Sequence, residues 1–190
     1  MNNSIKKYLH ENRSERSPDL ELAILLTQEN RVENICTYAS KVIGGRWLEA
    51  EPIILEGSIE DITKYLQDVV RGRWAEAEPI LLERGKLEDA MYYAVNVMGC
   101  RWIEFEKKFL DTFRQFLDSK CDRDNPEEML KRARMWWKLS MILSTYIEGV
   151  IKERWEEAED VISRADDTVR LYYRIRTGIK IERVWNYENK

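Results

Sequence analysis

Apolar positions follow the period of an α-helix in four separate stretches of the chain. In residues 59–70 they recur three, six, seven, ten and eleven positions after the first, which places them on one face of a helix. The same spacing holds in residues 32–43 and 87–98, and more weakly in 140–151, where Ser140 takes the first position. We therefore predict a helix over each of these stretches.

Each predicted helix leads into the same aromatic motif. An Arg-Trp pair follows it, and a Tyr stands nine positions before each Trp. The pairs are Tyr38 with Trp47, Tyr65 with Trp74, Tyr93 with Trp102, and Tyr146 with Trp155. The tryptophans are 27, 28 and 53 residues apart, and the last gap is close to two periods. One spacing kept four times indicates a repeated structural unit.

The residues around Arg-Trp predict a turn between two helices. Gly72 and Gly99 can adopt the left-handed or tight conformation with which a helix ends. The Arg that follows each glycine interacts favourably with the dipole at the C-terminus of that helix. Two Glu residues beyond each Trp suit the first turn of the next helix. These short helices are predicted to end near residues 53–55 and 80–82. Each unit is thus a long helix, a turn and a short helix.

A unit of this length cannot bury its own apolar face, so neighbouring units must pack together. We predict an all-α protein, built as a short solenoid or compact stack of helical hairpin repeats with a longer-helix C-terminal half. It is expected to form one domain over residues 1–190. Its predicted parts are a polar segment at 1–16, hairpin repeats at 17–118, a loop at 119–126, and longer helices with a C-terminal cap at 127–190.

The repeat is interrupted after its third copy. The helix starting near Ile103 continues to Leu117, and another starts at Pro126 and is predicted to run to Ile151. Residues 166–187 lose the register, and we expect a basic helix there that caps the stack. At the other end, the run Ser17-Pro18-Asp19 resembles the start of a short helix that serves as an N-terminal half-unit.

The segment Tyr38-Ala39…Val42-Ile43-Gly44-Gly45-Arg46-Trp47-Leu48-Glu49-Ala50-Glu51-Pro52 resembles tandem helical repeats of tailed-bacteriophage proteins. The resemblance covers residues 32–110 well and 140–162 more loosely, and residues 103–139 depart from it. It implies a viral origin and a role inside an infected bacterial cell. Many proteins with such repeats have no assigned role, so the resemblance transfers no catalytic residue.

Composition and charge narrow the function classes. Hydrophobic residues make up 44% of the 190 positions and charged residues 35%, which fits a packed core and excludes a disordered tail. The net charge of −4 repels a phosphate backbone overall, although residues 101–190 carry a balance of +1. Three cysteines at irregular spacing favour a reducing compartment. With no apolar run that spans a membrane, we expect a location in the host bacterial cytoplasm.

Catalytic and metal-binding patterns are absent from the sequence. His10 is the only histidine, so a histidine-based catalytic unit would have to use it, and a histidine-based zinc site is excluded. The Glu pairs stand two positions apart, which on a helix points them to different faces and favours dipole or salt-bridge roles over a metal site. Phosphate-binding loops and nucleophile motifs are missing as well. We expect no enzyme, no cofactor and no metal.

The eight repeat aromatics are predicted to be structural, with each Trp filling the contact between hairpins and its Arg covering the turn. The alternative is an exposed Arg-Trp ladder on which bases stack. The adjacent Trp136 and Trp137 lie about 100° apart on a helix, so both cannot enter one narrow core stripe. Trp136 is in register with Leu139 and Leu143, which leaves Trp137 for the margin or for solvent, where aromatic residues anchor partners. The alternative is a wide buried face in the middle of the stack that takes both rings.

Basic and aromatic residues outside the repeat motif form the candidate partner-binding set, and the alternative is a solvated cationic face without a binding role. Its members are Arg134, Trp136, Trp137, Lys138, Arg174, Arg176 and Trp185. The leading hypothesis, which rests on the resemblance, is a phage-encoded interaction module that binds and inhibits or redirects a host protein in host takeover or anti-defence. One alternative is nucleic-acid binding through the basic C-terminal half. Another is a structural protein that self-assembles into a homo-oligomer through exposed hairpin edges.

Overall fold

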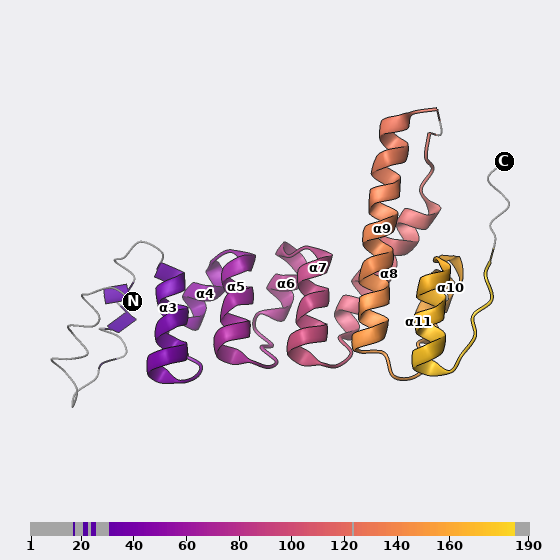
Figure 1. Cartoon of the computed structure of the whole chain (residues 1–190). Coiled ribbons are helices and arrows are strands. Elements are labelled where there is room, and N and C mark those ends of the chain that lie inside the picture. The colour runs from indigo at the N-terminus through magenta and orange to yellow at the C-terminus, as the bar shows by residue number, and fades with distance from the viewer. Residues whose placement is uncertain (1–16, 18–20, 23, 26–30, 123, 185–190) are drawn as a thin grey trace. The chain divides into compact units, whose positions relative to one another are not determined.

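Every regular element that the structure describes is a helix, as the sequence predicts (Figure 1). The structure is a computed structural model that describes residues 17, 21, 22, 24, 25, 31–122 and 124–184. The chain divides into two compact units, residues 1–85 and 86–190. The division falls inside the predicted run of hairpin repeats. The sequence predicts a single domain and a short solenoid or compact stack. Both depend on how the two units are placed relative to each other, so both stay predictions.

The first unit contains two copies of a long helix followed by a short one. Its elements are α3 (Arg31–Tyr38), η1 (Ala39–Ile43), α4 (Glu51–Glu56), α5 (Ile59–Tyr65), η2 (Leu66–Val70) and α6 (Glu78–Arg84). Helix α5 begins at the N-cap residue Ser58, which forms a capping box with Asp61. It packs against α3 and α4. The predicted long helices and short helices are therefore confirmed in this unit.

The second unit starts with the same pattern and then lengthens it. Its elements are α7 (Leu87–Tyr92), η3 (Tyr93–Met98), α8 (Ile103–Asp118), α9 (Pro126–Gly149), η4 (Glu156–Ala158), α10 (Glu159–Arg164) and α11 (Asp167–Thr177). Helix α9 packs against α7, η3 and α11, and α8 packs against α7 and α10. The predicted elongated helix after Ile103 and the restart at Pro126 are both confirmed.

The first three long helices end in a π-helical turn closed by a left-handed residue. The backbone N–H of Gly44, Arg71 and Gly99 bonds to a carbonyl five residues earlier at 2.8–2.9 Å. The φ angles are 79° at Gly44, 52° at Arg71 and 62° at Gly99. The prediction was right for Gly99 and wrong for Gly72, because the left-handed residue of that turn is Arg71. A non-glycine residue there carries a conformational cost that glycine avoids.

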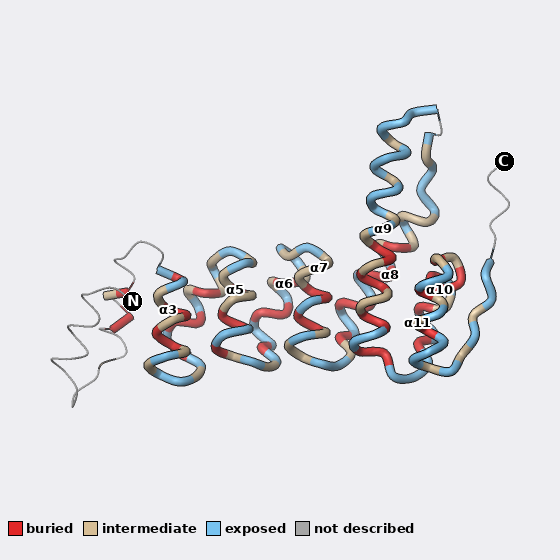
Figure 2. Tube along the Cα trace, in the orientation of Figure 1, coloured by how far each residue is buried: buried red, intermediate tan, exposed pale blue. Residues whose placement is uncertain are grey.

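Helix α9 has two halves with different surroundings. Its C-terminal half carries buried side chains such as Leu139, Leu143 and Ile147. Its N-terminal half extends past α7, α10 and α11 and is largely exposed (Figures 1 and 2). Asn125 caps this end by accepting hydrogen bonds from the backbone N–H of Glu127 and Glu128. The end of α8 and the start of α9 therefore form a hairpin added within one repeat period.

Helix α11 keeps one position of the repeat register, which the sequence analysis missed. Tyr173 stands 27 residues after Tyr146, and its hydroxyl accepts a hydrogen bond from the Trp155 N–H at 2.8 Å. The prediction that residues 166–187 lose the register was therefore wrong at this tyrosine. It was missed because polar residues or glycine take the other register positions, namely Asp167, Arg170, Arg174, Thr177 and Gly178.

Candidate functional site

The eight repeat aromatics lie in the core. Their rings pair within each unit at centroid distances of 5.0–5.5 Å, and each of the eight side chains is at most 2% exposed. The members are Tyr38 with Trp47, Tyr65 with Trp74, Tyr93 with Trp102, and Tyr146 with Trp155. Base stacking needs an accessible ring face. Burial therefore contradicts the Arg-Trp ladder and supports the structural interpretation.

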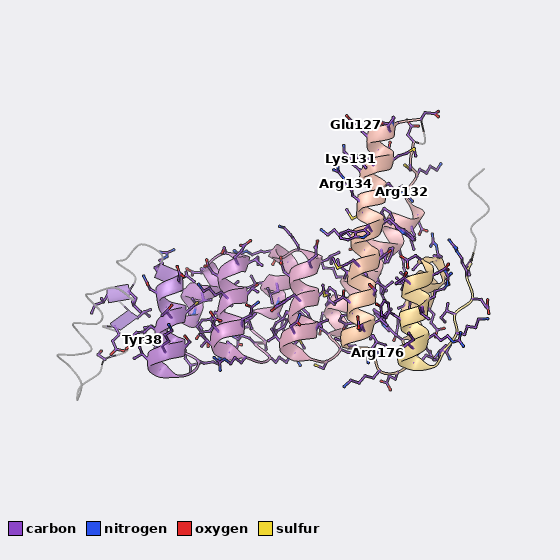
Figure 3. The ribbon with its side chains drawn as sticks, viewed as in Figure 1. Tyr38, Glu127, Lys131, Arg132, Arg134 and Arg176 are labelled. Carbon is purple, nitrogen blue, oxygen red and sulfur yellow. The ribbon has the colours of Figure 1, made fainter. Side chains whose placement is uncertain are left out.

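The tyrosine hydroxyl connects one repeat to the preceding one. The backbone N–H of Trp47 donates to the Tyr65 hydroxyl at 2.8 Å, and Trp102 donates to Tyr146 at 2.9 Å. In turn the Tyr146 hydroxyl donates to Glu106 Oε1 at 2.7 Å. The Tyr38 hydroxyl, labelled in Figure 3, donates to the buried carboxylate of Glu21. Each hydroxyl thus satisfies polar groups from an earlier part of the chain.

Each repeat Arg binds the carboxylate of a Glu five residues later in its own motif. Arg46 donates through Nε and Nη2 to the two oxygens of Glu51. The same two-bond contact joins Arg73 to Glu78, Arg101 to Glu106, and Arg154 to Glu159, with all eight distances between 2.6 and 3.0 Å. The spacing of five residues was the available sequence signal. The expectation that each Arg serves the helix dipole overlooked this pairing.

The two Glu residues of each motif face different surroundings, as their spacing predicts. Glu51 is buried, and Glu49 is exposed. The exposed Glu76 of the next repeat lies 3.9 Å from Arg46, whose guanidinium also lies 5.9 Å from the Trp74 ring. Arg46 therefore contacts both its own repeat and the one that follows. This supports the salt-bridge interpretation of the Glu pairs.

Burial keeps the hydroxyls of Tyr65, Tyr146 and Tyr173 protonated. Burial raises the pKa of Tyr65 to about 12. The hydrogen bond from the Trp47 N–H lowers this pKa by a smaller amount, and the neighbouring Glu51 raises it further. Burial also raises the pKa of Tyr146 and of Tyr173. The hydrogen bond to Glu51 raises the pKa of Arg46, so this pair stays charged. At neutral pH the phenols are therefore donors to carboxylates.

Trp136 belongs to the packing of the added hairpin. Its ring lies 5.9 Å from that of Phe113 and 6.1 Å from that of Phe116, both on α8. Arg132 lies 4.7 Å from the Phe116 ring and donates to Ser119 Oγ at 2.7 Å. These contacts hold α8 against α9, so the Trp136 ring packs inside the hairpin.

Trp137 lies on the outer side of α9 and is 70% exposed. Leu130, seven positions earlier, is 53% exposed, and the exposed Arg134 lies between them. Steps of four and three residues place these side chains on one face of the helix. Lys131 flanks this face. We call Leu130, Lys131, Arg134 and Trp137 the α9 face.

The two cations of the α9 face are exposed. No carboxylate of the described residues is within ion-pair distance of Lys131 or Arg134. Figure 3 shows Lys131, Arg134 and Glu127 along one side of α9, and Arg132 on the side toward α8. The α9 face therefore combines an exposed aromatic ring with two cations that are open to an external partner.

The other predicted partner-binding residues fall in different places. Lys138 forms an ion pair with Glu88 at 2.7 Å. Burial raises the pKa of the Glu88 carboxyl, but the Lys138 hydrogen bond and charge, together with a backbone hydrogen bond and Lys86, lower it overall. Arg176 donates to the carbonyl of Glu148 on α9. Arg174 is exposed on α11. Trp185 and His10 lie outside the described residues. The structure thus brings only Arg134 and Trp137 of the predicted set together on one open face.

Comparisons with known proteins give no relative. No protein-family model matches the chain, and neither the curated proteins nor the solved structures that were searched contain a match. Within the ranges that the structure describes, no helix has the length and apolarity to cross a bilayer. The resemblance to phage repeats stays a prediction.

Proposed function

We propose that this protein is a phage-encoded interaction module that binds a host protein and inhibits or redirects it. The observation that carries the proposal is the exposure of Trp137 beside Leu130 and two cations. Single exposed apolar side chains are ordinary on protein surfaces. An exposed Trp grouped with Arg and an aliphatic residue has the composition of a binding hot spot.

The position of the α9 face supports a role beyond folding. It lies on the added hairpin, whereas the repeat junctions use the C-terminal half of α9 through Tyr146. All four repeat tryptophans are at most 2% exposed, and Trp137 is 70% exposed. Solvent exposure of a large aromatic ring is unfavourable, so covering it with a partner gives a gain in free energy.

Affinity capture tests this proposal. The tagged full chain is incubated with a bacterial lysate, alongside a Trp137→Ala variant and a Leu171→Ala control, since Leu171 is 55% exposed on α11. We expect a protein that wild type and the control retain and Trp137→Ala loses. Adding wild-type protein should then inhibit the activity of the captured protein or change its binding partner. Failure to retain any protein, or equal retention by Trp137→Ala, would contradict the proposal.

The contacts of the C-terminal cations give less support to nucleic-acid binding. Arg164 pairs with Asp118 at 2.9 Å, and Lys180 pairs with Glu182 at 2.7 Å. Arg170 pairs with Asp167. Cations neutralised by the chain's own carboxylates release fewer counterions on meeting a phosphate backbone.

A further inference from the structure

The charges of the added hairpin are separated along its length. Lys131 and Arg134 lie on the α9 face, whereas the exposed charges toward the tip are mainly acidic, with Asp122, Asp124 and Glu127 outnumbering Lys120 among the described residues. The cationic region is therefore bounded by carboxylates within one to two helical turns. A ligand that contacts the α9 face meets two positive charges beside Trp137 and negative charge beyond them.

We infer that the partner of the α9 face is an acidic protein groove, with an apolar floor that accepts Trp137 and carboxylates on its rim opposite Lys131 and Arg134. This inference rests on the proposed function. Leu130, Arg134 and Trp137 have the i, i+4, i+7 spacing with which one helix docks into the groove of another protein. In this arrangement α9 is the inserted helix.

The apolar and charged members of the face have different roles. Burial of the Trp137 ring contributes most of the binding free energy, as aromatic anchors do at protein interfaces. Lys131 and Arg134 are solvent-exposed in the free protein, so their pairing with carboxylates mainly sets the association rate and the choice of partner. Their removal is therefore expected to change selectivity and salt dependence together.

The carboxylates near the tip argue against a phosphate backbone as the partner. A nucleic acid carries negative charge at every phosphate, so a duplex or single strand following α9 toward Asp124 and Glu127 would meet repulsion. A protein groove can place carboxylates only where the cations lie. The charge pattern thus favours an acidic protein over nucleic acid.

Charge reversal of the α9 face tests the inference. The variant is Lys131→Glu with Arg134→Glu, and the control is Lys107→Glu with Lys152→Glu, which changes the net charge equally at two other exposed lysines. The probes are amphipathic peptides of about 20 residues, long enough for about five helical turns. One carries Glu and the other Lys on its polar face, both with Leu on the apolar face, and a duplex DNA of similar charge is a third probe.

The expected results are ratios of dissociation constants measured by fluorescence anisotropy with the full chain. Wild type should bind the Glu peptide at least about tenfold more tightly than the Lys peptide or the DNA. The Lys131→Glu/Arg134→Glu variant should lose about tenfold for the Glu peptide, and the control should change less than about twofold. Equal binding of the Lys peptide or the DNA, or an unchanged affinity in the charge-reversed variant, would overturn the inference.

Two further measurements separate the inference from the proposed function. If the lysate yields a partner that Trp137→Ala loses but the charge-reversed variant retains, the proposed function stands and the acidic groove is wrong. If sedimentation shows that wild type self-associates and Trp137→Ala does not, a second copy occupies the face and the acidic groove is also wrong. Circular dichroism of the charge-reversed variant should match wild type, because Lys131 and Arg134 form no ion pair with the described residues.

Discussion

The ring and the hydroxyl of a repeat tyrosine such as Tyr65 contact different parts of the chain. The Tyr65 ring packs on Trp74, nine residues later, and its hydroxyl accepts from Trp47 N–H, 18 residues earlier. The nine-residue spacing is visible in the sequence because both rings belong to one repeat. The hydroxyl contact was not predicted, since it depends on how α5 packs against the preceding repeat.

Tyr65→Phe should lower the free energy of unfolding by about 1–3 kcal/mol, because it leaves the Trp47 N–H without its acceptor in the core. Urea denaturation followed by circular dichroism measures the change. Tyr92→Phe is the control, with Tyr92 39% exposed, and should change the free energy by less than about 0.5 kcal/mol. Equal effects of the two variants would show that the hydroxyl contributes nothing.

High pH should unfold the protein through these phenols. Burial raises the pKa of Tyr65 to about 12, above the value of about 10 in an unfolded chain. The stabilisation is therefore complete below about pH 10 and is lost as the pH rises through about 12. Unfolding midpoints measured over this range should fall steeply for wild type and less steeply for Tyr65→Phe. A parallel fall in both proteins would contradict the assignment.

At the scale of helices, the turn that ends a long helix has the same backbone geometry whether its left-handed residue is Gly or Arg. The three π-helical turns η1, η2 and η3 each close with a left-handed residue, and two of these three residues are glycine. Sequence analysis placed the middle one at Gly72 because glycine usually takes this conformation. Arg71 takes it instead, since the i−5 hydrogen bond to Leu66 fixes where the helix ends.

Arg71→Gly should stabilise the protein by about 0.5 kcal/mol. Relief of the left-handed conformation, about 1–2 kcal/mol, exceeds the added chain entropy of glycine, about 0.5–1 kcal/mol. Gly99→Ala is the reciprocal variant. It should destabilise by about 1 kcal/mol from the backbone alone, because a Cβ at Gly99 meets no atom within 4 Å. Thermal unfolding of both variants measures these effects, and a destabilised Arg71→Gly would refute the strain argument.

At the scale of the whole molecule, α11 shows how the second unit ends. Leu143 and Ile147 of α9 are fully buried, and the equivalent positions of α11 hold Arg170 and Arg174. Arg170 bonds to the Ala165 carbonyl, and Arg174 is exposed. In repeat proteins, a helix pair that ends a stack carries polar residues on its outer face. The two arginines place charge at positions where α9 has apolar residues, and the C-terminal cap stays a prediction.

Arg174→Ile should cause self-association, because it extends the apolar surface formed by the exposed Leu171 and Ile175. Sedimentation equilibrium should show a mass that rises with concentration more steeply than that of wild type. Arg174→Lys keeps the charge and should behave as wild type. A monomeric Arg174→Ile protein at the highest concentration would argue that another feature prevents association.

The sequence by itself determined the helical class and the spacing of the paired Tyr and Trp, and it left the position of Trp137 open. These follow from periodicity, because residues at fixed spacings on a helix share a face whatever that helix packs against. Only the tertiary structure decided that the Tyr173 hydroxyl bonds to Trp155 as the Tyr65 and Tyr146 hydroxyls bond to earlier tryptophans. It also decided that the Trp136 ring packs against α8. Finally, it showed that Lys138 forms an ion pair with Glu88, whereas Lys131 and Arg134 form none with the described residues. Such contacts join residues from different elements, and their partners are set by how the helices pack rather than by spacing along the chain.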